Sequence, residues 1–483
     1  MKINIDKNNA FVFSIVICST LLGFAFYQSL SLEGGQDTWQ HFLISKYALN
    51  YPELLIDQWN KPVFTWCTTL FCNLGLNAMV IFNIVSVLLS SIIIAFSLQK
   101  AKIKLAWLAI PLICFCPIVL GNTISCLTEP LNMLILSLVL FLWQFEFKKI
   151  SIIIASFLPY LRTEGFVICG AIFIFIILIK EYSYLPWLLV GSIILNIVGF
   201  AITNHPFWII SDNPYLKAEL ESTFDPGKGN FLHYLHAARQ IFGLPSLILF
   251  LGGNILFIYQ VIKTKISNKM VLLSLLIFWS YFLAHTAIYY LGILGSHGLT
   301  RVMAVIVPSM IIVSLYFLSF ILEKLNSVHK NIKHVLPIAI ALLCIWIGYK
   351  ETGYAKPYRI SEPTVKIDRV NNNLLKAGTW LQNNHLLDRT IIHQSPYFNV
   401  MFNKNPYDVK SSYYIWSIDK KNDWAAKGVI VTWEGYYCTR EGNMPLKWLQ
   451  ENTNYKLLTY IKGIDEKGKA DEMLDIYIFE KIN

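Results

Sequence analysis

Charged side chains that could do chemistry gather directly after the first long apolar run of the chain. Residues 10–30 are apolar, and Glu33, Asp37, Asp57 and Lys61 follow in one polar segment. A charge beside a bilayer that is not a flanking anchor is costly, and it usually marks a functional site. The position of these four residues predicts chemistry at the surface of a membrane.

Asp37 is the candidate general base. It begins a helix-like, amphipathic stretch, where its carboxylate could take the proton from an acceptor hydroxyl. An aspartate at a helix start also stabilises the first turn by about 1 kcal/mol, and the sequence does not separate the two roles. Glu33 is a candidate second carboxylate or metal ligand, because Gly34 and Gly35 let the loop bend toward Asp37. A solvated loop glutamate is the alternative.

Three cationic residues are candidates for binding a phosphate. Lys61 stands where the loop returns to the membrane and could hold a phosphate as a point charge; an interfacial lysine that extends toward water is the alternative. Arg162 and Arg301 each begin an apolar run, and a guanidinium fork suits phosphate or pyrophosphate. Either arginine could instead serve as an anchor or in an ion pair with Glu129 or Glu164.

Further polar residues stand at the mouths of the same apolar runs. We assign Asp57, Glu129, Glu164 and His297 to the substrate pocket on this basis. Glu129 precedes a proline at a helix start, where the helix dipole favours an acid without any function.

Histidines and cysteines give no metal-site spacing, and neither a phosphate-cradling glycine motif nor a dinucleotide fingerprint is present. We therefore expect no cofactor, although a divalent cation bound by carboxylates stays open.

The composition places these residues in a membrane protein. Hydrophobic residues make up 55% of the chain and charged residues only 14%, whereas a soluble domain carries about 25% charge. A membrane-spanning helix needs about 20 apolar residues. Eleven candidate spans follow from this criterion, with 150–161 the shortest: 10–30, 78–97, 105–121, 128–146, 150–161, 165–180, 185–203, 244–262, 270–291, 302–322 and 335–350.

The lysines predict how the spans are oriented. With a cytoplasmic N-terminus, eleven crossings put every compact lysine cluster of residues 1–350 on the inner side, as the positive-inside rule requires. The net charge of +10 is then a topology signal and not a nucleic-acid-binding patch. We predict a multi-pass protein of the cytoplasmic (inner) membrane whose candidate site residues all lie on the outer side.

The end of the chain has a different character. Residues 351–483 are soluble in composition, with a helix-like stretch at 369–385 and β-like runs at 390–395, 427–433, 455–462 and 474–481. Such alternation indicates a small α/β domain. The expected architecture is an α-helical polytopic membrane domain, residues 1–350 with the first outer loop at 31–62, followed by an extracytoplasmic α/β domain.

Several short motifs together resemble a known family. The loop motif D-x-W-x-K-P-x-F-T at 57–65 is followed by T-E-P at 128–130, L-R-T-E-G-F at 161–166 and S-H-G-L-T-R at 296–301, each at the start of a span. This order is similar to that of the multispan GT-C glycosyltransferases that use lipid-linked sugars, especially the bacterial mannosyltransferase-like and aminoarabinose-transferase-like members. The resemblance covers most of residues 10–350.

The resemblance implies a polyprenyl-phosphate sugar as donor and transfer outside the membrane with inversion at the anomeric carbon. It implies Asp37 as base and Lys61 as a contact to the donor phosphate. Relatives commonly carry two adjacent acids in this loop, whereas Asp37 stands alone here, with Glu33 or Asp57 as possible partners. The acceptor is a hydroxyl of a glycan, a lipid or a protein.

Two other functions remain as alternatives. A transporter or flippase of lipid-linked glycans would carry charges near mid-span and two related halves, and neither is visible in the sequence. A polymerase of surface glycans handles the same lipid carriers, but such proteins usually lack a soluble C-terminal α/β domain.

Overall fold

The computed structural model describes residues 5–29, 32, 34–211, 228–264, 268–294, 296–325, 332–352, 369–415, 425–465 and 468–483. The chain forms two compact units. The first unit comprises residues 1–29 and 48–360, and the second comprises 30–47 and 361–483. Helix α2 (Gln36–Tyr47), which carries Asp37, is thus part of the second unit.

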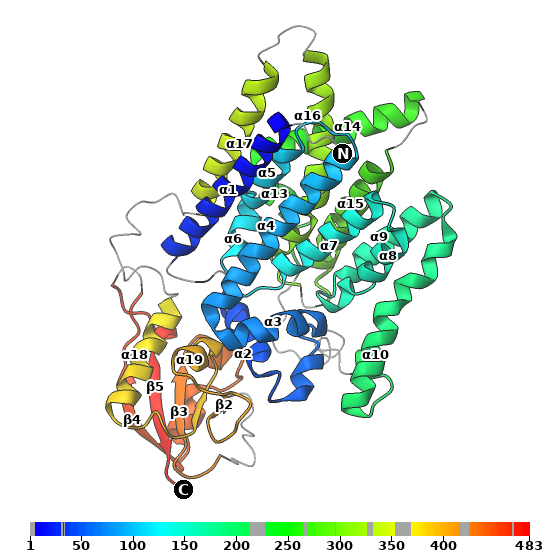
Figure 1. The fold of residues 1–483 in the computed structure, drawn as a ribbon. Coiled ribbons are helices and arrows are strands. Elements are labelled where there is room, and N and C mark those ends of the chain that lie inside the picture. The colour runs from blue at the N-terminus through cyan, green and yellow to red at the C-terminus, as the bar shows by residue number, and fades with distance from the viewer. Residues whose placement is uncertain are drawn as a thin grey trace. The chain divides into compact units, whose positions relative to one another are not determined.

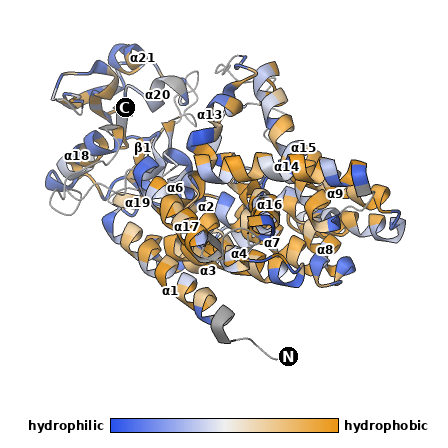
Figure 2. Cartoon of the chain, turned by 90° about the horizontal axis from the view of Figure 1, so that it is seen from above, coloured by the Kyte–Doolittle hydropathy of each residue, from blue (hydrophilic) through white to orange (hydrophobic). Residues whose placement is uncertain are grey.

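Within the described ranges, six helical segments of the first unit are long and apolar enough to cross a membrane. They are α1 (Ile5–Gln28), α4 (Leu76–Lys100), η4 with α10 (Tyr182–Leu189 and Val190–Thr203), α14 (Leu244–Thr264), α15 (Lys269–Leu291), and η5 with α16 (Thr300–Ile306 and Val307–Leu325). The ribbons of α1, α4, α14, α15 and α16 are coloured mostly as hydrophobic in Figure 2.

Other apolar stretches are broken into shorter helices. Helices α5 (Ala109–Cys114) and α6 (Pro117–Thr123) meet at 63° and make a seventh crossing if the bent pair is one span. The break has a local cause, because a residue before proline is driven out of the helical region and Cys116 has a ψ of 125°. Helices α7 (Glu129–Gln144) and α9 (Gly165–Leu178) have only 16 and 14 residues. The polytopic helical fold is confirmed, but the number of eleven crossings is not.

The remaining elements of the first unit are shorter helices and turns together with the 20-residue helix α17. They are η1 (Pro52–Ile56), α3 (Pro62–Leu74), η2 (Ala106–Leu108), α8 (Lys148–Ala155), η3 (Leu158–Tyr160), α11 (Trp208–Ser211), α13 (His233–Phe242) and α17 (Ile332–Glu351). Figure 1 shows α1 and α4 running alongside α5.

Small and polar residues bring the helices of the first unit close together. Helix α4 packs along α7, where the hydroxyls of Ser90 and Ser137 lie 2.5 Å apart. Helix α14 packs along α16, and a Cβ added at Gly253 would lie 2.5 Å from the carbonyl oxygen of Val313. Close backbone approach at small residues is typical of membrane helix pairs.

The second unit is built on a five-stranded mixed sheet of order β2-β1-β3-β5-β4. Strand β1 (Ile391–His393) runs parallel to β2 (Ser412–Tyr414) and β3 (Ile430–Glu434), while β5 (Ile476–Lys481) is antiparallel to β3 and β4 (Tyr455–Ile461). Besides α2, the unit contains α18 (Arg369–Asn383), α19 (Pro396–Met401), α20 (Tyr437–Arg440), α21 (Leu446–Glu451) and η8 (Glu472–Leu474). The expected α/β domain is confirmed, and only the three-residue strand β2 was not predicted.

Candidate active site

The first unit contains a compact cluster of buried and partly buried charges built from three separate segments. Glu129 begins α7 and is fully buried, Arg162 and Glu164 lie in the turn between η3 and α9, and Arg301 lies in η5. Arg162 is 2.8 Å from Oε1 of Glu129 and 3.0 Å from Oε1 of Glu164. Nε of Arg301 lies 3.4 Å from the same oxygen of Glu129. The structure therefore brings four of the predicted site residues together.

Ion pairing dominates the electrostatics of this cluster. Burial alone would raise the pKa of Glu164, but the charges of Arg162 and then His285 outweigh it and lower that pKa to about 2. The two carboxylates likewise hold the pKa of Arg162 well above its usual range, against the effect of burial. Both arginines thus have carboxylate partners, so the ion-pair alternative stated from the sequence has the necessary geometry.

Lys61 has a different environment, although it interacts electrostatically with Glu164 and Arg162. It caps α3 with a φ of 77° and is 8% exposed, and its ammonium donates a hydrogen bond to the carbonyl of Gln58 at 2.5 Å. Burial lowers the pKa of Lys61 to about 8, although Glu164 and Asp57 raise it in part. Burial disfavours the charged form of an amine, so an anion that binds beside the amine stabilises that charged form.

Asp57 supports the turn that presents Lys61. Its carboxylate accepts a hydrogen bond from the backbone N–H of Asn60 at 2.6 Å, and its carbonyl accepts one from the N–H of Lys61 at 3.0 Å. Burial raises the pKa of Asp57, whereas the hydrogen bond from Asn60 and the charge of Lys61 lower it.

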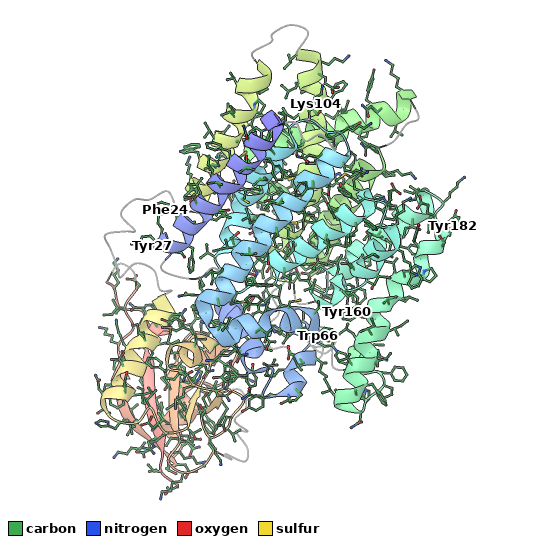
Figure 3. The ribbon with its side chains drawn as sticks, viewed as in Figure 1. Phe24, Tyr27, Trp66, Lys104, Tyr160 and Tyr182 are labelled. Carbon is green, nitrogen blue, oxygen red and sulfur yellow. The ribbon has the colours of Figure 1, made fainter. Side chains whose placement is uncertain are left out.

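Lys61 lines a small, partly open pocket of the first unit. The other lining residues come from three stretches of the chain and are Gln58, Pro62, Pro159, Tyr160, Thr163, Phe166, Trp208 and Ile209. Among the described residues, nothing hydrogen-bonds to the buried hydroxyl of Thr163. Figure 3 shows Tyr160 and Trp66 near each other at one end of the first unit and Lys104 at the opposite end. A pocket with one cation, a hydroxyl and several aromatic rings suits an amphiphilic anion.

Asp37 lies in the second unit, in the first turn of α2. Within this unit its charge acts on Glu441, since burial, and then Asp37, raise the pKa of Glu441, while a hydrogen bond from Gln394 lowers it. Sequence reasoning could not identify Glu441 as a neighbour of Asp37, because about four hundred residues separate the two.

The other predicted residues have different outcomes. Glu33 lies outside the described residues. His297 is exposed in the segment before η5. No group of three or more His, Cys, Asp or Glu residues that could hold a metal ion occurs in the described parts of the chain.

Sequence reasoning missed His285, whose Nε2 lies 3.8 Å from Oε1 of Glu164. Its position inside the apolar helix α15 was the available signal, because an ionisable residue within a span is usually functional or paired.

Comparison with known proteins supports the fold. Neither protein-family models nor curated proteins match this chain. Two crystal structures of ArnT from Cupriavidus metallidurans are similar. The apo form is 10% identical in sequence, covers 98% of each chain and has a TM-score of 0.62. The form bound to undecaprenyl phosphate is 8% identical, covers 97% of each chain and has a TM-score of 0.63. At such low identity the likeness establishes architecture. The chain therefore has the GT-C fold of ArnT over nearly its whole length.

Proposed function

We propose that the chain is a glycosyltransferase that moves a sugar from a polyprenyl phosphate to a hydroxyl of a glycan, lipid or protein at the outer face of the cytoplasmic membrane. The observation that carries this proposal is the full-length likeness to a protein crystallised with undecaprenyl phosphate. The buried Lys61 in a partly aromatic pocket supports it, because that pocket offers a cation to a phosphate and apolar surface to a prenyl chain.

The proposed reaction is a single displacement with inversion. The acceptor oxygen attacks the anomeric carbon and gives its proton to the carboxylate of Asp37. The bond between that carbon and the phosphate oxygen breaks at the same time, and the polyprenyl phosphate leaves with the electron pair. Lys61 stabilises the charge of the leaving phosphate in a buried setting, where a fixed cation has a larger effect than in water.

The charge cluster supplies further cations for the donor phosphate in the proposed reaction. Arg162 and Arg301 remain predicted contacts to the donor phosphate, and their ion pairs with Glu129 and Glu164 would hold their guanidinium groups in place beforehand. Preorganised charges need little rearrangement when the substrate arrives. Asp57 supports Lys61, His297 remains a candidate for the substrate pocket, and Glu33 remains a candidate second carboxylate beside Asp37.

Membrane vesicles that contain the endogenous acceptor provide the test. They are supplied with undecaprenyl-phosphate mannose, glucose or arabinose, each labelled in the sugar, and release of undecaprenyl phosphate is followed. We expect release from at least one donor with the parent chain and a loss of about 100-fold or more with Asp37→Asn, the upper range for a general base. Glu441→Gln, a neighbouring carboxylate in the second unit, is the matched comparison. Equal rates for Asp37→Asn and the parent would contradict the base assignment, and no release from any donor would contradict the proposed function.

A further inference from the structure

Helix α2 is attached to the second unit by two glutamines on one of its faces. Gln36 donates a hydrogen bond to Oδ1 of Asn371 at 3.1 Å and accepts one from the hydroxyl of Ser395 at 3.0 Å. Gln40 accepts a hydrogen bond from the hydroxyl of Tyr414 at 2.6 Å and donates a longer one to Tyr407 at 3.5 Å. Each amide group therefore uses both its donor and its acceptor.

This arrangement fixes the rotation of α2 about its own axis. Residues four apart lie on the same face of a helix, so Gln36 and Gln40 form one row of contacts. The ring of Trp39 adds an edge-to-face contact with Tyr397, with ring centroids 5.2 Å apart. Asp37 follows Gln36 directly, and successive residues of an α-helix are about 100° apart around the axis. A helix held by this row has one fixed direction for the Cα–Cβ bond of Asp37.

The contacts follow the order of the parallel strands. Tyr414 ends β2, Ser395 follows the end of β1, and Glu441 follows the end of β3. These three strands are adjacent in the order β2-β1-β3. Gln40 and Gln36 thus hydrogen-bond to residues at the end of β2 and just after β1, and the charge of Asp37 acts on Glu441 after β3. The carboxyl ends of parallel strands are where α/β sheets usually bind their ligands, and here that edge binds α2.

We propose that Gln36 and Gln40 are positioning residues that hold the Asp37 carboxylate in its reactive direction, and that the second unit is therefore part of the catalytic machinery. This inference rests on the proposed function, in which Asp37 is the base. A loosely held base loses rate, because a misplacement of about 1 Å can reduce turnover by about a hundredfold. The second unit then contributes to turnover without having to bind the donor.

The test compares Gln36→Ala and Ser395→Ala with the parent, using the three labelled donors in membrane vesicles and the binding of unlabelled undecaprenyl phosphate in detergent. We expect kcat to fall by about ten- to a hundredfold, while the affinity for undecaprenyl phosphate and the number of binding sites stay unchanged. Gln382→Ala is the matched control, because Gln382 is an exposed glutamine on α18 of the same unit. It should keep the parent kcat.

A second readout separates positioning from a loss of folded protein. The Asp37→Asn variant has no base that needs to be positioned, so adding Gln36→Ala to it should leave the residual rate nearly unchanged. A purely structural defect would instead lower the residual rate by the same factor as in the parent. That outcome, or a parent-like kcat for both Gln36→Ala and Ser395→Ala, would overturn the inference. If Asp37→Asn itself is fully active, the proposed function fails first, so the two failures are distinguishable.

Discussion

Lys61 combines two energetically unfavourable features, burial and a strained backbone, with a proposed role in binding phosphate. Its ammonium is nearly buried and donates a hydrogen bond to one main-chain carbonyl, and its backbone has a positive φ. Unusual backbone conformations and buried charges of this kind occur at functional sites, where surrounding contacts maintain them. The conformation of the K-P turn is therefore consistent with a site that binds an anion.

The pKa of Lys61 gives a pH-dependent prediction for phosphate binding. Burial lowers this pKa to about 8. Without bound phosphate, the Lys61 side chain is therefore charged below that pH and neutral above it. A bound phosphate raises the pKa of Lys61. We expect the affinity for undecaprenyl phosphate to fall by about ten- to a hundredfold between pH 7 and pH 10, as one charge-assisted hydrogen bond is lost. Lys61→Met should bind weakly at both pH values. A parent affinity that is flat over this range would contradict the role of Lys61.

Glu129 gives a prediction about stability. Its removal leaves Arg162 and Arg301 without a shared, fully buried counter-charge, and breaking a buried ion pair from one side costs about 3–5 kcal/mol. Glu129→Ala should therefore lower the thermal unfolding temperature markedly in detergent. Glu323→Ala removes the exposed ion pair with Lys104, which contributes at most about 1 kcal/mol. Equal shifts for the two variants would show that the buried cluster contributes no special stability.

At the scale of the elements, the apolar runs predicted the long helices. The prolines that break a helix were present in the sequence, but the prediction did not use them. The runs 244–262 and 270–291 closely match α14 and α15. The run 105–121 contains Pro111 and Pro117 and becomes two helices at 63°. The ion pairs of the charge cluster were foreseen only as an alternative role of Arg162 and Arg301, because helix packing alone determines that these residues meet Glu129. The docking of α2 on strands more than 350 positions later had no local signal at all.

The close approach of α14 and α16 also makes a prediction. A side chain at Gly253 would collide with the backbone oxygen of Val313, and overfilling a packed site costs about 1–3 kcal/mol. Gly253→Ala should lower the unfolding temperature. Gly170→Ala is the matched control, because no atom lies within 4 Å of its added Cβ. A smaller effect at Gly253 than at Gly170 would contradict this account of the interface.

For the whole molecule, composition and lysine placement predicted the class and the order of the parts. The GT-C fold and the α/β sheet are confirmed, whereas the orientation in the membrane stays a prediction. The boundary between the two units does not follow the chain, since residues 30–47 group with residues 361–483. Sequence reasoning divides a chain into consecutive segments, so it could not find a unit assembled from two distant ones.

Orientation can be tested with reporters at fixed positions. Alkaline phosphatase folds in the periplasm and not in the cytoplasm, because it requires disulfides. Fusions after Asn483 should therefore be active, and fusions after Lys104 should be inactive. Green fluorescent protein at the same positions should give the opposite pattern. Activity of the Lys104 fusion together with inactivity of the Asn483 fusion would place the candidate site on the wrong side of the membrane.

The second unit is assembled from two distant parts of the chain, and this has a consequence for biosynthesis. Gln36 and Ser395 are 359 positions apart, and a ribosome that adds roughly 5–20 residues per second needs about 20–70 seconds to cover that distance. During this interval the nascent chain has α2 but lacks the strands that hold it. Under the proposed function, a ribosome-bound intermediate in the bilayer would therefore encounter lipid carriers before Asp37 is held in place, and sugar transfer would begin only after translation has ended.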